Sequence, residues 1–228
     1  MKSEMSGIVT LKNVSKKFSS KNDNLLLFKD VNLIINEGES VSISGPSGSG
    51  KSTLLNIIAL LERATSGEVI VNGKDISTLK DRELTLLRRS FAFMFQKTFL
   101  FPSWSVEENI MLPRLISGKK CNRQDINALV ERLGLQGKLK QKTENLSGGE
   151  KSRVSLIRAI ASDGVLIFAD EPTGSLDRDN ALKVEEELLS LVKDYGKSLL
   201  YVTHSNEFAN RADKKYVIED KTLKAIGN

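Results

Sequence analysis

The sequence is poor in cysteine and has no long apolar run, and each absence narrows the kind of protein it encodes. Its single cysteine, Cys121, cannot form an internal disulfide, which fits a reducing cytoplasm, and we expect Cys121 to be a bystander. No stretch approaches the about 20 consecutive apolar residues that span a bilayer. The opening stretch MKSEMSGIVTLKNV has no apolar core after its first charge, so we expect no secretion signal.

Strong charge is also missing. The formal net charge is +5, and basic residues occur as scattered pairs, at 16–17, 88–89, 119–120 and 214–215. Nucleic-acid binding needs a clustered basic patch, so we expect no nucleic-acid partner, whereas attraction to an anionic membrane surface stays open. With 39% hydrophobic and 28% charged residues, the 228 residues suit one globular domain with room for an inserted lobe.

Strands and helices alternate along most of the chain, which predicts an α/β fold with a parallel sheet. Antiparallel strands are expected near the start, where IVTLKNVSKKF alternates, and a hairpin is expected at the C-terminus. Residues 97–145 contain two prolines, clustered aromatic residues and amphipathic stretches, and they predict a mostly helical insertion. A helix over 180–196 is expected to place Leu182, Leu189 and Val192 on one side.

The segment GPSGSGKST, residues 45–53, fits the phosphate-loop pattern G-x-x-x-x-G-K-[ST] between an apolar strand and an apolar helix. Its glycines let successive N–H groups point at phosphate oxygens, and the following helix adds its positive N-terminal end. Lys51 is expected to reach the β- and γ-phosphates of ATP, and the Ser52 hydroxyl to hold Mg²⁺. The residues expected to bind the nucleotide here are Gly45, Ser47, Gly48, Ser49, Gly50, Lys51, Ser52 and Thr53.

Two acids end the buried strand VLIFADE, at the sheet edge where ligands of open parallel sheets sit. Asp170 is the candidate Mg²⁺ ligand. Glu171 points differently, because side chains alternate along a strand, and is placed to polarise a water that attacks the γ-phosphate. Acids often only cap a strand end, but the phosphate loop favours a functional pair.

A histidine and a glutamine also follow apolar strands. His204, the only histidine, ends the strand SLLYVTH and could bond the γ-phosphate, although such a histidine is more often structural. Gln96 follows the strand FAFMF where the helical insertion begins. It could contact the Mg²⁺ and water at the site and report their presence to the insertion.

A second Ser-Gly-Gly turn leads into a helix in ENLSGGEKSRVSLIRAIA, residues 144–161. Such a turn at a helix N-terminus is typical of a phosphate site. One chain therefore carries two candidate phosphate sites.

In order and spacing, these motifs resemble the nucleotide-binding subunit of an ABC transporter over essentially the full length. The resemblance comprises the phosphate loop, the Q-loop Gln96, the signature LSGGE at 146–150, the Walker B run 165–171, the D-loop SLD at 175–177 and the switch His204. It implies a P-loop NTPase cassette with a RecA-like parallel-sheet core, an antiparallel β subdomain and an inserted α-helical subdomain. The core and β subdomain would occupy about 1–96 and 160–228, and the helical subdomain about 97–159, of a single ATP-binding domain.

The same resemblance implies that two copies pack head to tail, with ATP between the phosphate loop of one and the signature of the other. Ser147, Gly148 and Gly149 would then bond the γ-phosphate of ATP held by the second copy, and Asp177 would lie at that interface. Phe18 occupies the place of an aromatic residue that stacks on adenine, the alternative being a core phenylalanine.

STLLNIIALLE, ENIMLPRLI and ADEPTGSLD are similar to the group that powers lipoprotein release, macrolide efflux and antimicrobial-peptide or bacteriocin export. This implies an ATPase held on the inner face of the cell membrane by an integral membrane permease. The sequence departs from the group by lacking the usual glutamine pair after the signature. It is also rich in aromatic residues at Phe99, Phe101 and Trp104, which either line the groove for the permease's coupling helix or pack inside the helical lobe.

The alternative function is a soluble ABC ATPase without a transported substrate, for example in cluster assembly. A small-molecule kinase would leave the signature and the D-loop unexplained.

Overall fold

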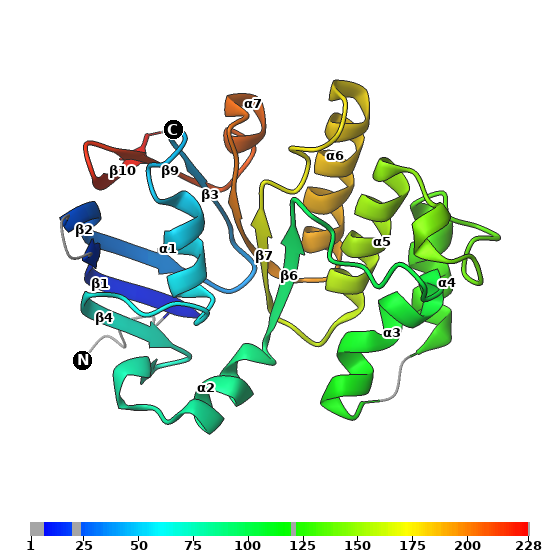
Figure 1. The fold of residues 1–228 in the computed structure, drawn as a ribbon, viewed down its shortest axis with the longest axis horizontal. Coiled ribbons are helices and arrows are strands. Elements are labelled where there is room, and N and C mark those ends of the chain that lie inside the picture. The colour runs from blue at the N-terminus through cyan, green and yellow to red at the C-terminus, as the bar shows by residue number, and fades with distance from the viewer. Residues whose placement is uncertain (1–6, 20–23, 120–121, 228) are drawn as a thin grey trace. The chain divides into compact units, whose positions relative to one another are not determined.

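The computed structural model describes residues 7–19, 24–119 and 122–227 (Figure 1). Cys121 lies outside the described residues. The chain forms two compact units. Unit 1 comprises residues 1–88 and 198–228, and unit 2 comprises residues 89–197.

Unit 1 contains an antiparallel sheet in the strand order β2-β1-β4-β5. Its strands are β1 (Val9–Ser19), β2 (Asn24–Ile35), β4 (Ser66–Val71) and β5 (Lys74–Asp75). Val9 faces Ile35 on one side and Val71 on the other, and all three are fully buried. The alternating apolar and polar residues that predicted strands here thus correspond to a buried and an outer face of the sheet.

Unit 1 also contains β3 (Ser40–Ser44), β8 (Ser198–Val202), β9 (Lys214–Glu219) and β10 (Thr222–Ile226), in the order β10-β9-β3-β8. β3 runs parallel to both β8 and β9, whereas β9 and β10 form an antiparallel hairpin. Asp220 and Lys221 turn this hairpin with φ of 50° and 60°, the signs that a tight hairpin turn requires. The expected parallel sheet and closing hairpin are confirmed.

The described residues of unit 1 also form the helices α1 (Lys51–Ile58), α2 (Asp81–Arg88) and α7 (Asn206–Ala209) and a short 3₁₀ turn, η1 (Ile76–Thr78). α1 packs against β8, and its Leu54, Leu55 and Ile57 are fully buried.

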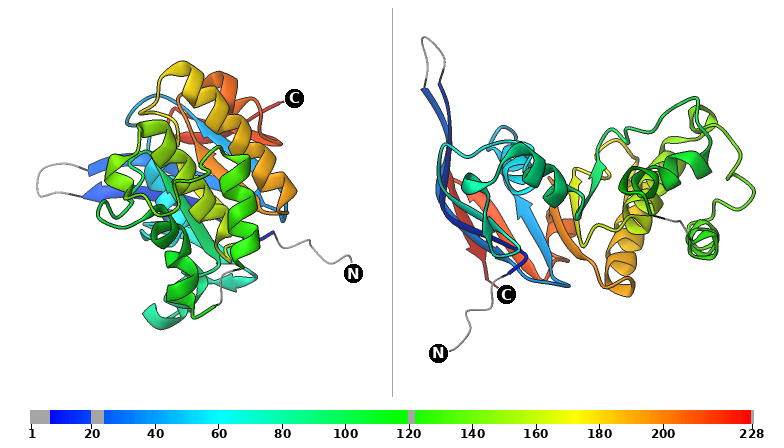
Figure 2. Two further views of the ribbon diagram at one scale, coloured as in Figure 1. Left: turned by 90° about the vertical axis from the view of Figure 1, so that its right-hand side faces the viewer. Right: turned by 90° about the horizontal axis from the view of Figure 1, so that it is seen from below.

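Unit 2 is built on two parallel strands, β6 (Phe91–Phe95) and β7 (Leu166–Asp170). Its helices are α3 (Val106–Ser117), α4 (Arg123–Arg132), α5 (Gly148–Ala161) and α6 (Arg178–Asp194), with a 3₁₀ turn η2 (Thr143–Asn145). α5 packs against β6, α3, α4 and α6, and Figure 2 shows it from two further directions. The helices expected in residues 97–145 are present, while the subdomain limits at 97–159 stay a prediction.

The buried face of α6 differs from the expectation. Val192 is buried, as are Val184, Leu188 and Leu191. Leu182 and Leu189 are only half-buried, so they do not share the buried face with Val192. Glu185 lies on the buried face because it has a hydrogen-bond partner there, described below.

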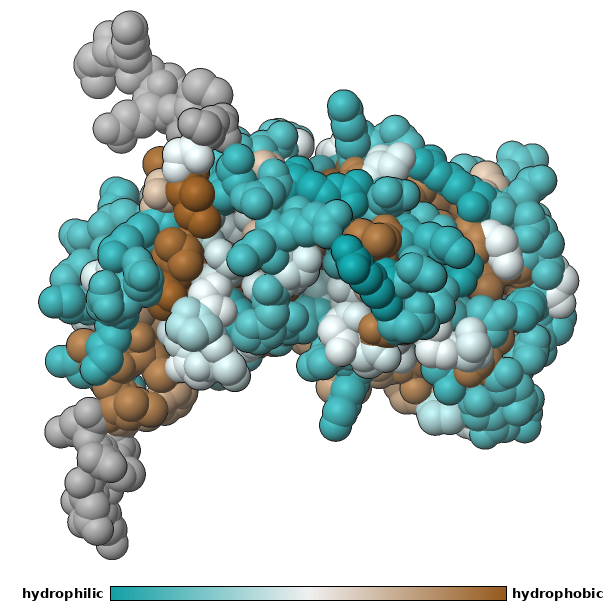
Figure 3. Space-filling view, turned by 90° about the horizontal axis from the view of Figure 1, so that it is seen from above, coloured by the Kyte–Doolittle hydropathy of each residue, from teal (hydrophilic) through white to brown (hydrophobic). Residues whose placement is uncertain are grey.

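Hydrophilic residues cover most of the face shown in Figure 3, and hydrophobic residues gather in a few areas of it. Among the described residues, no helix is both long and apolar enough to cross a bilayer.

Candidate functional site

The phosphate loop joins β3 to α1 and is held by its own lysine. Lys51 is 6% exposed, and its Nζ donates to the carbonyl oxygens of Gly45 and Pro46 at 2.9 and 3.0 Å. A Cβ at Gly45 would lie 2.7 Å from the Ile218 carbonyl oxygen, so only glycine fits there. The Lys51 ammonium therefore lies inside the loop, where it bonds backbone carbonyl oxygens of the loop itself.

This loop suits an anion. α1 begins after Gly50, whose φ of 96° is left-handed. Among the residues that the structure describes, no side chain caps this helix by a hydrogen bond, and its first turn contains no acid. The Ser49 hydroxyl oxygen is enclosed and has no hydrogen-bond partner among the described residues. An uncapped helix N-terminus, a buried lysine and an enclosed hydroxyl fit the phosphate groups of a nucleotide.

His204 and the phosphate loop follow neighbouring strands of unit 1. β3 and β8 are parallel, with Ile43 opposite Val202, so the chain leaves both strands at the same edge. His204 is exposed between β8 and the start of α7. The structure thus brings the predicted histidine to the edge that carries the loop.

Phe18 lies near the end of β1 and is 44% exposed, so it is not the core phenylalanine that was the alternative. The Lys16 ammonium lies 4.8 Å from the centre of its ring. The ring is therefore exposed at the surface, with the Lys16 ammonium over one of its faces.

In unit 2, the ends of β6 and β7 bring Gln96, Asp170 and Glu171 to one edge. Phe95 is opposite Asp170, so Gln96 and Glu171 both follow the paired ends. Glu171 has a φ of 48°, which an ordinary residue adopts only under local constraint. A Cβ at Gly174 would lie 3.0 Å from Gln96 Nε2, so the glutamine packs directly against the turn after Glu171.

That turn is tied to α6 at two points. The Thr173 hydroxyl donates to Glu185 Oε1 at 3.0 Å, and Glu185 is 4% exposed. Asp177 caps α6 by accepting the Asn180 N–H at 3.0 Å, and hydrogen bonds from Asn180 lower the pKa of Asp177. Glu185 was not expected from the sequence, because an acid in an amphipathic helix normally faces solvent.

The signature forms the N-terminus of α5 as a capping box. The Ser147 oxygen accepts the Glu150 N–H at 3.3 Å, and Glu150 Oε2 accepts the Ser147 N–H at 2.8 Å. The Ser147 hydroxyl also bonds the Glu150 carboxylate. A hydrogen bond from Lys138 and, to a smaller extent, this contact lower the pKa of Glu150. Gly148 and Gly149 form the first turn, where N–H groups have no partner within the helix.

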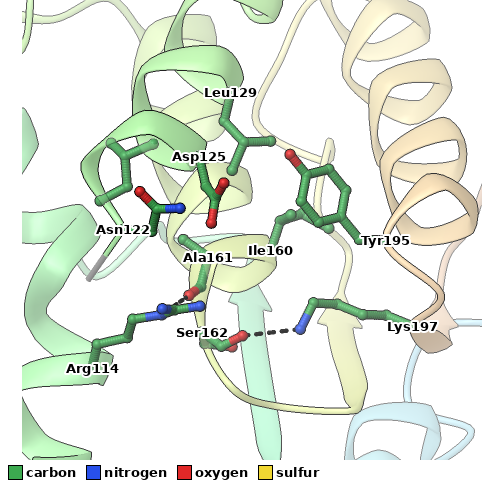
Figure 4. Close-up of a pocket in the computed structure, with 10 residues that line it drawn as sticks. Arg114, Asn122, Asp125, Leu129, Ile160, Ala161, Ser162, Tyr195 and Lys197 are labelled. Atoms are coloured by element: carbon green, nitrogen blue, oxygen red, sulfur yellow. Dashed lines mark hydrogen bonds between the residues drawn. The ribbon is translucent and has the colours of Figure 1, made fainter. Parts of the chain in front are cut away.

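The opposite end of α5 borders a pocket of about 190 Å³ (Figure 4). Arg114 Nε donates to the Ala161 carbonyl at 2.6 Å, and Lys197 Nζ donates to the Ser162 carbonyl at 3.0 Å. Burial lowers the pKa of Lys197. The two cations bond carbonyl groups at the C-terminal, negative end of α5. The signature lies at the other end of this 14-residue helix, about 20 Å away, so the pocket is separate from the signature.

The aromatic residues after Gln96 lie on the surface. Phe99, Phe101 and Trp104 are 65%, 45% and 36% exposed, so they are not packed inside the helical lobe. Phe101 stacks on Trp104 with 4.5 Å between ring centres. Phe99 lines a shallow groove with residues of the signature turn, including Gly148.

Backbone contacts hold these rings in place. The fully buried Asn109 accepts the Phe101 N–H at 2.7 Å and donates to the Phe101 and Ser105 carbonyls at 3.2 and 3.0 Å. The Arg158 guanidinium donates to the Thr98 and Phe99 carbonyls, and burial lowers the pKa of Arg158. Neither residue was singled out from the sequence, since their partners lie on other elements.

The predicted site residues therefore fall into two groups. Unit 1 carries Phe18, the phosphate loop and His204, and unit 2 carries Gln96, Asp170, Glu171, the signature and Asp177. Among the described residues, no three acids, histidines or cysteines cluster as a ready-made metal cage. The residues predicted to hold a metal, Ser52, Gln96 and Asp170, all offer oxygen atoms, the ligand type that Mg²⁺ takes in proteins.

Comparisons with known proteins agree with this description. A family model described as ABC transporter matches residues 28–174. The lipoprotein-releasing system ATP-binding protein LolD of Ehrlichia ruminantium (strain Gardel) is 43% identical over 223 residues, which cover 96% of this chain and 97% of LolD.

A putative ABC transporter ATP-binding protein of Mycoplasma genitalium, MG065, is 40% identical over 220 residues, but the chain spans only 47% of its length. Among solved structures, the dimeric ATP-binding cassette MJ0796 in a post-hydrolysis state with ADP and Pi superposes with a TM-score of 0.83 at 35% identity. The match covers 96% of this chain and 99% of MJ0796.

Proposed function

This chain belongs to the ABC transporter ATP-binding family, and from that membership we propose that it drives a membrane permease of the lipoprotein-release or a related export type. It is an ATP-binding and ATP-hydrolysing cassette of that family. The stretches that resemble the export group agree with the 43% identity to LolD.

In this proposal each motif acts on one part of the nucleotide. Lys51 contacts the β- and γ-phosphates, and Phe18 stacks on adenine. Ser52, Asp170 and Gln96 would hold Mg²⁺, which neutralises phosphate charge when bound. Glu171 orients the attacking water, and His204 bonds the γ-phosphate.

The observation that carries the proposal is the presence of two helix N-termini suited to phosphate in one chain. α1 begins after Gly50 without a capping side chain, and α5 begins with Gly148 and Gly149. In the proposal, the N-terminus of α1 binds the ATP of its own chain, and the N-terminus of α5 binds the ATP held by a second copy. The dimeric structures of the cassette MJ0796 support a dimer of such chains. In this proposal the two copies pack head to tail, ATP closes the dimer and hydrolysis releases it.

The permease is proposed to contact unit 2 at the exposed rings of Phe99, Phe101 and Trp104. The groove beside Phe99 also contains Gln96 and Gly148, so a partner seated there would touch both the Q-loop and the signature turn. This contact would hold the cassette on the inner face of the cell membrane.

Glu171→Gln tests the proposal. A residue that orients the attacking water contributes about 10²- to 10⁴-fold to the rate, so turnover should fall by that factor while ATP binding persists. The variant should then elute as a dimer with ATP and as a monomer without it. Wild-type turnover by the variant, or a monomer with saturating ATP, would refute the assignment.

A further inference from the structure

The signature of this chain ends in an acid, Glu150, whose carboxylate has two partners in the structure. Glu150 Oε2 accepts the Ser147 N–H at 2.8 Å. Its other oxygen, Oε1, accepts from the Lys138 ammonium, with which it forms an ion pair. Lys138 lies in the loop after α4, so the contact joins two segments 12 residues apart.

The charge is present at neutral pH. The hydrogen bond from Lys138, followed by the one from Ser147, lowers the pKa of the Glu150 carboxyl. The capping box therefore places a negative charge in the same first turn of α5 as the N–H groups of Gly148 and Gly149. A carboxylate there opposes the approach of a phosphate, which the same helix end otherwise attracts.

The other cations near this helix end have different partners. Arg153 Nε donates to the Gly149 carbonyl at 3.5 Å, and Lys151 Nζ donates to the Glu144 carbonyl at 3.5 Å. Of the cations described in this part of the chain, Lys138 is the one whose ammonium bonds the Glu150 carboxylate.

We propose that Lys138 is a positioning residue that neutralises Glu150, so that the acid can fix the Ser147 cap without repelling the γ-phosphate of ATP held by a second copy. The inference rests on the proposed head-to-tail dimer. Glu150 fixes the Ser147 backbone at the start of α5, and Lys138 offsets the electrostatic cost of using an acid for that purpose.

Lys138→Met tests this in a Glu171→Gln background, which traps the ATP dimer. Without Lys138, the negative charge of Glu150 lies uncompensated near the phosphate. In a solvated site this weakens phosphate binding by on the order of threefold to tenfold. Both nucleotide sites form when the dimer forms, so the two effects multiply. The dimer dissociation constant with Mg-ATP should therefore rise about tenfold to a hundredfold. The increase should shrink at high salt, because the charges are partly exposed.

Rescue separates charge from folding. Glu150→Gln keeps a capping-box side chain but removes the charge, so it should restore dimerisation of Lys138→Met to near the level of the Glu171→Gln parent. Lys140→Met is the matched control, since Lys140 lies two residues away and pairs with Glu107 instead. This control should dimerise like the parent. Dimer constants come from sedimentation equilibrium, ATP binding to the monomer from titration with a fluorescent ATP analogue, and folding from thermal melts.

The outcomes are distinct. A parent that fails to dimerise with ATP overturns the proposed function and this inference with it. A parent that dimerises while Lys138→Met matches it within twofold overturns the inference alone. Weak dimerisation of Lys138→Met without rescue by Glu150→Gln, or a lowered melting temperature that accounts for it, also overturns the inference.

Discussion

Replacing Asn109 with alanine should loosen the aromatic surface of unit 2 in a way that one fluorophore reports. Asn109 is fully buried and makes three hydrogen bonds, two with the Phe101 backbone and one with the Ser105 carbonyl. Phe101 in turn stacks on Trp104, the only tryptophan in the sequence. Loss of the three hydrogen bonds should therefore change the environment of the Trp104 indole.

The magnitude follows from the number of bonds and their burial. Each intramolecular hydrogen bond contributes about 0.5–1.5 kcal/mol net, so the free energy of unfolding should fall by about 2–4 kcal/mol. Asn32 is the matched control. It also takes part in three hydrogen bonds, with Asn13 and the Asp30 carbonyl, but it is exposed, so water replaces its partners. Asn32→Ala should cost about 1 kcal/mol or less.

Urea unfolding followed at Trp104 measures both effects. Asn109→Ala should lower the midpoint at unchanged slope, and its folded form should show a red-shifted emission because Phe101 no longer covers the indole. Equal losses for Asn109→Ala and Asn32→Ala would refute the argument from burial. An unchanged emission spectrum would refute the argument that Asn109 positions the rings.

Two further variants probe the phosphate loop and the turn after Glu171. Lys51→Ala should weaken ATP binding itself, because it removes the charge beside the β- and γ-phosphates; an unchanged affinity in a binding titration would count against the phosphate-loop assignment. Thr173→Val should leave the buried Glu185 carboxylate without this donor and lower the free energy of unfolding by about 1–3 kcal/mol, with turnover reduced more than ATP affinity. Thr173→Ser should retain wild-type values, and a loss as large as that of valine would show that the hydroxyl is not what matters.

The sequence predicted the elements with strong periodicity and the motifs with fixed spacing. The phosphate loop, the strand that ends at Asp170 and the helix that starts at Gly148 lie where the residue pattern predicted them. Local chemistry decides these features, because glycine conformations, strand alternation and helix caps depend on residues a few positions apart.

The residues that escaped prediction depend on distant partners. Glu185 faces inward because Thr173 on another segment donates to it, and Lys138 matters because the loop after α4 returns to α5. Leu182, Leu189 and Val192 were expected on one side of α6, since apolar residues occur on several sides of that helix. Val192 is buried, but Val184, Leu188 and Leu191 form the rest of the buried face.

The most direct test of the central claim, that the signature serves the nucleotide of a second copy, mixes two inactive variants. Ser147→Arg places a bulky cation where the second copy's γ-phosphate should rest, and Lys51→Ala disables the phosphate loop. A heterodimer of the two has one composite site with both lesions and one with neither. The account predicts that each variant alone fails to close and turn over ATP, while the mixture recovers dimer formation and measurable hydrolysis. Normal dimerisation and turnover by Ser147→Arg alone would contradict it.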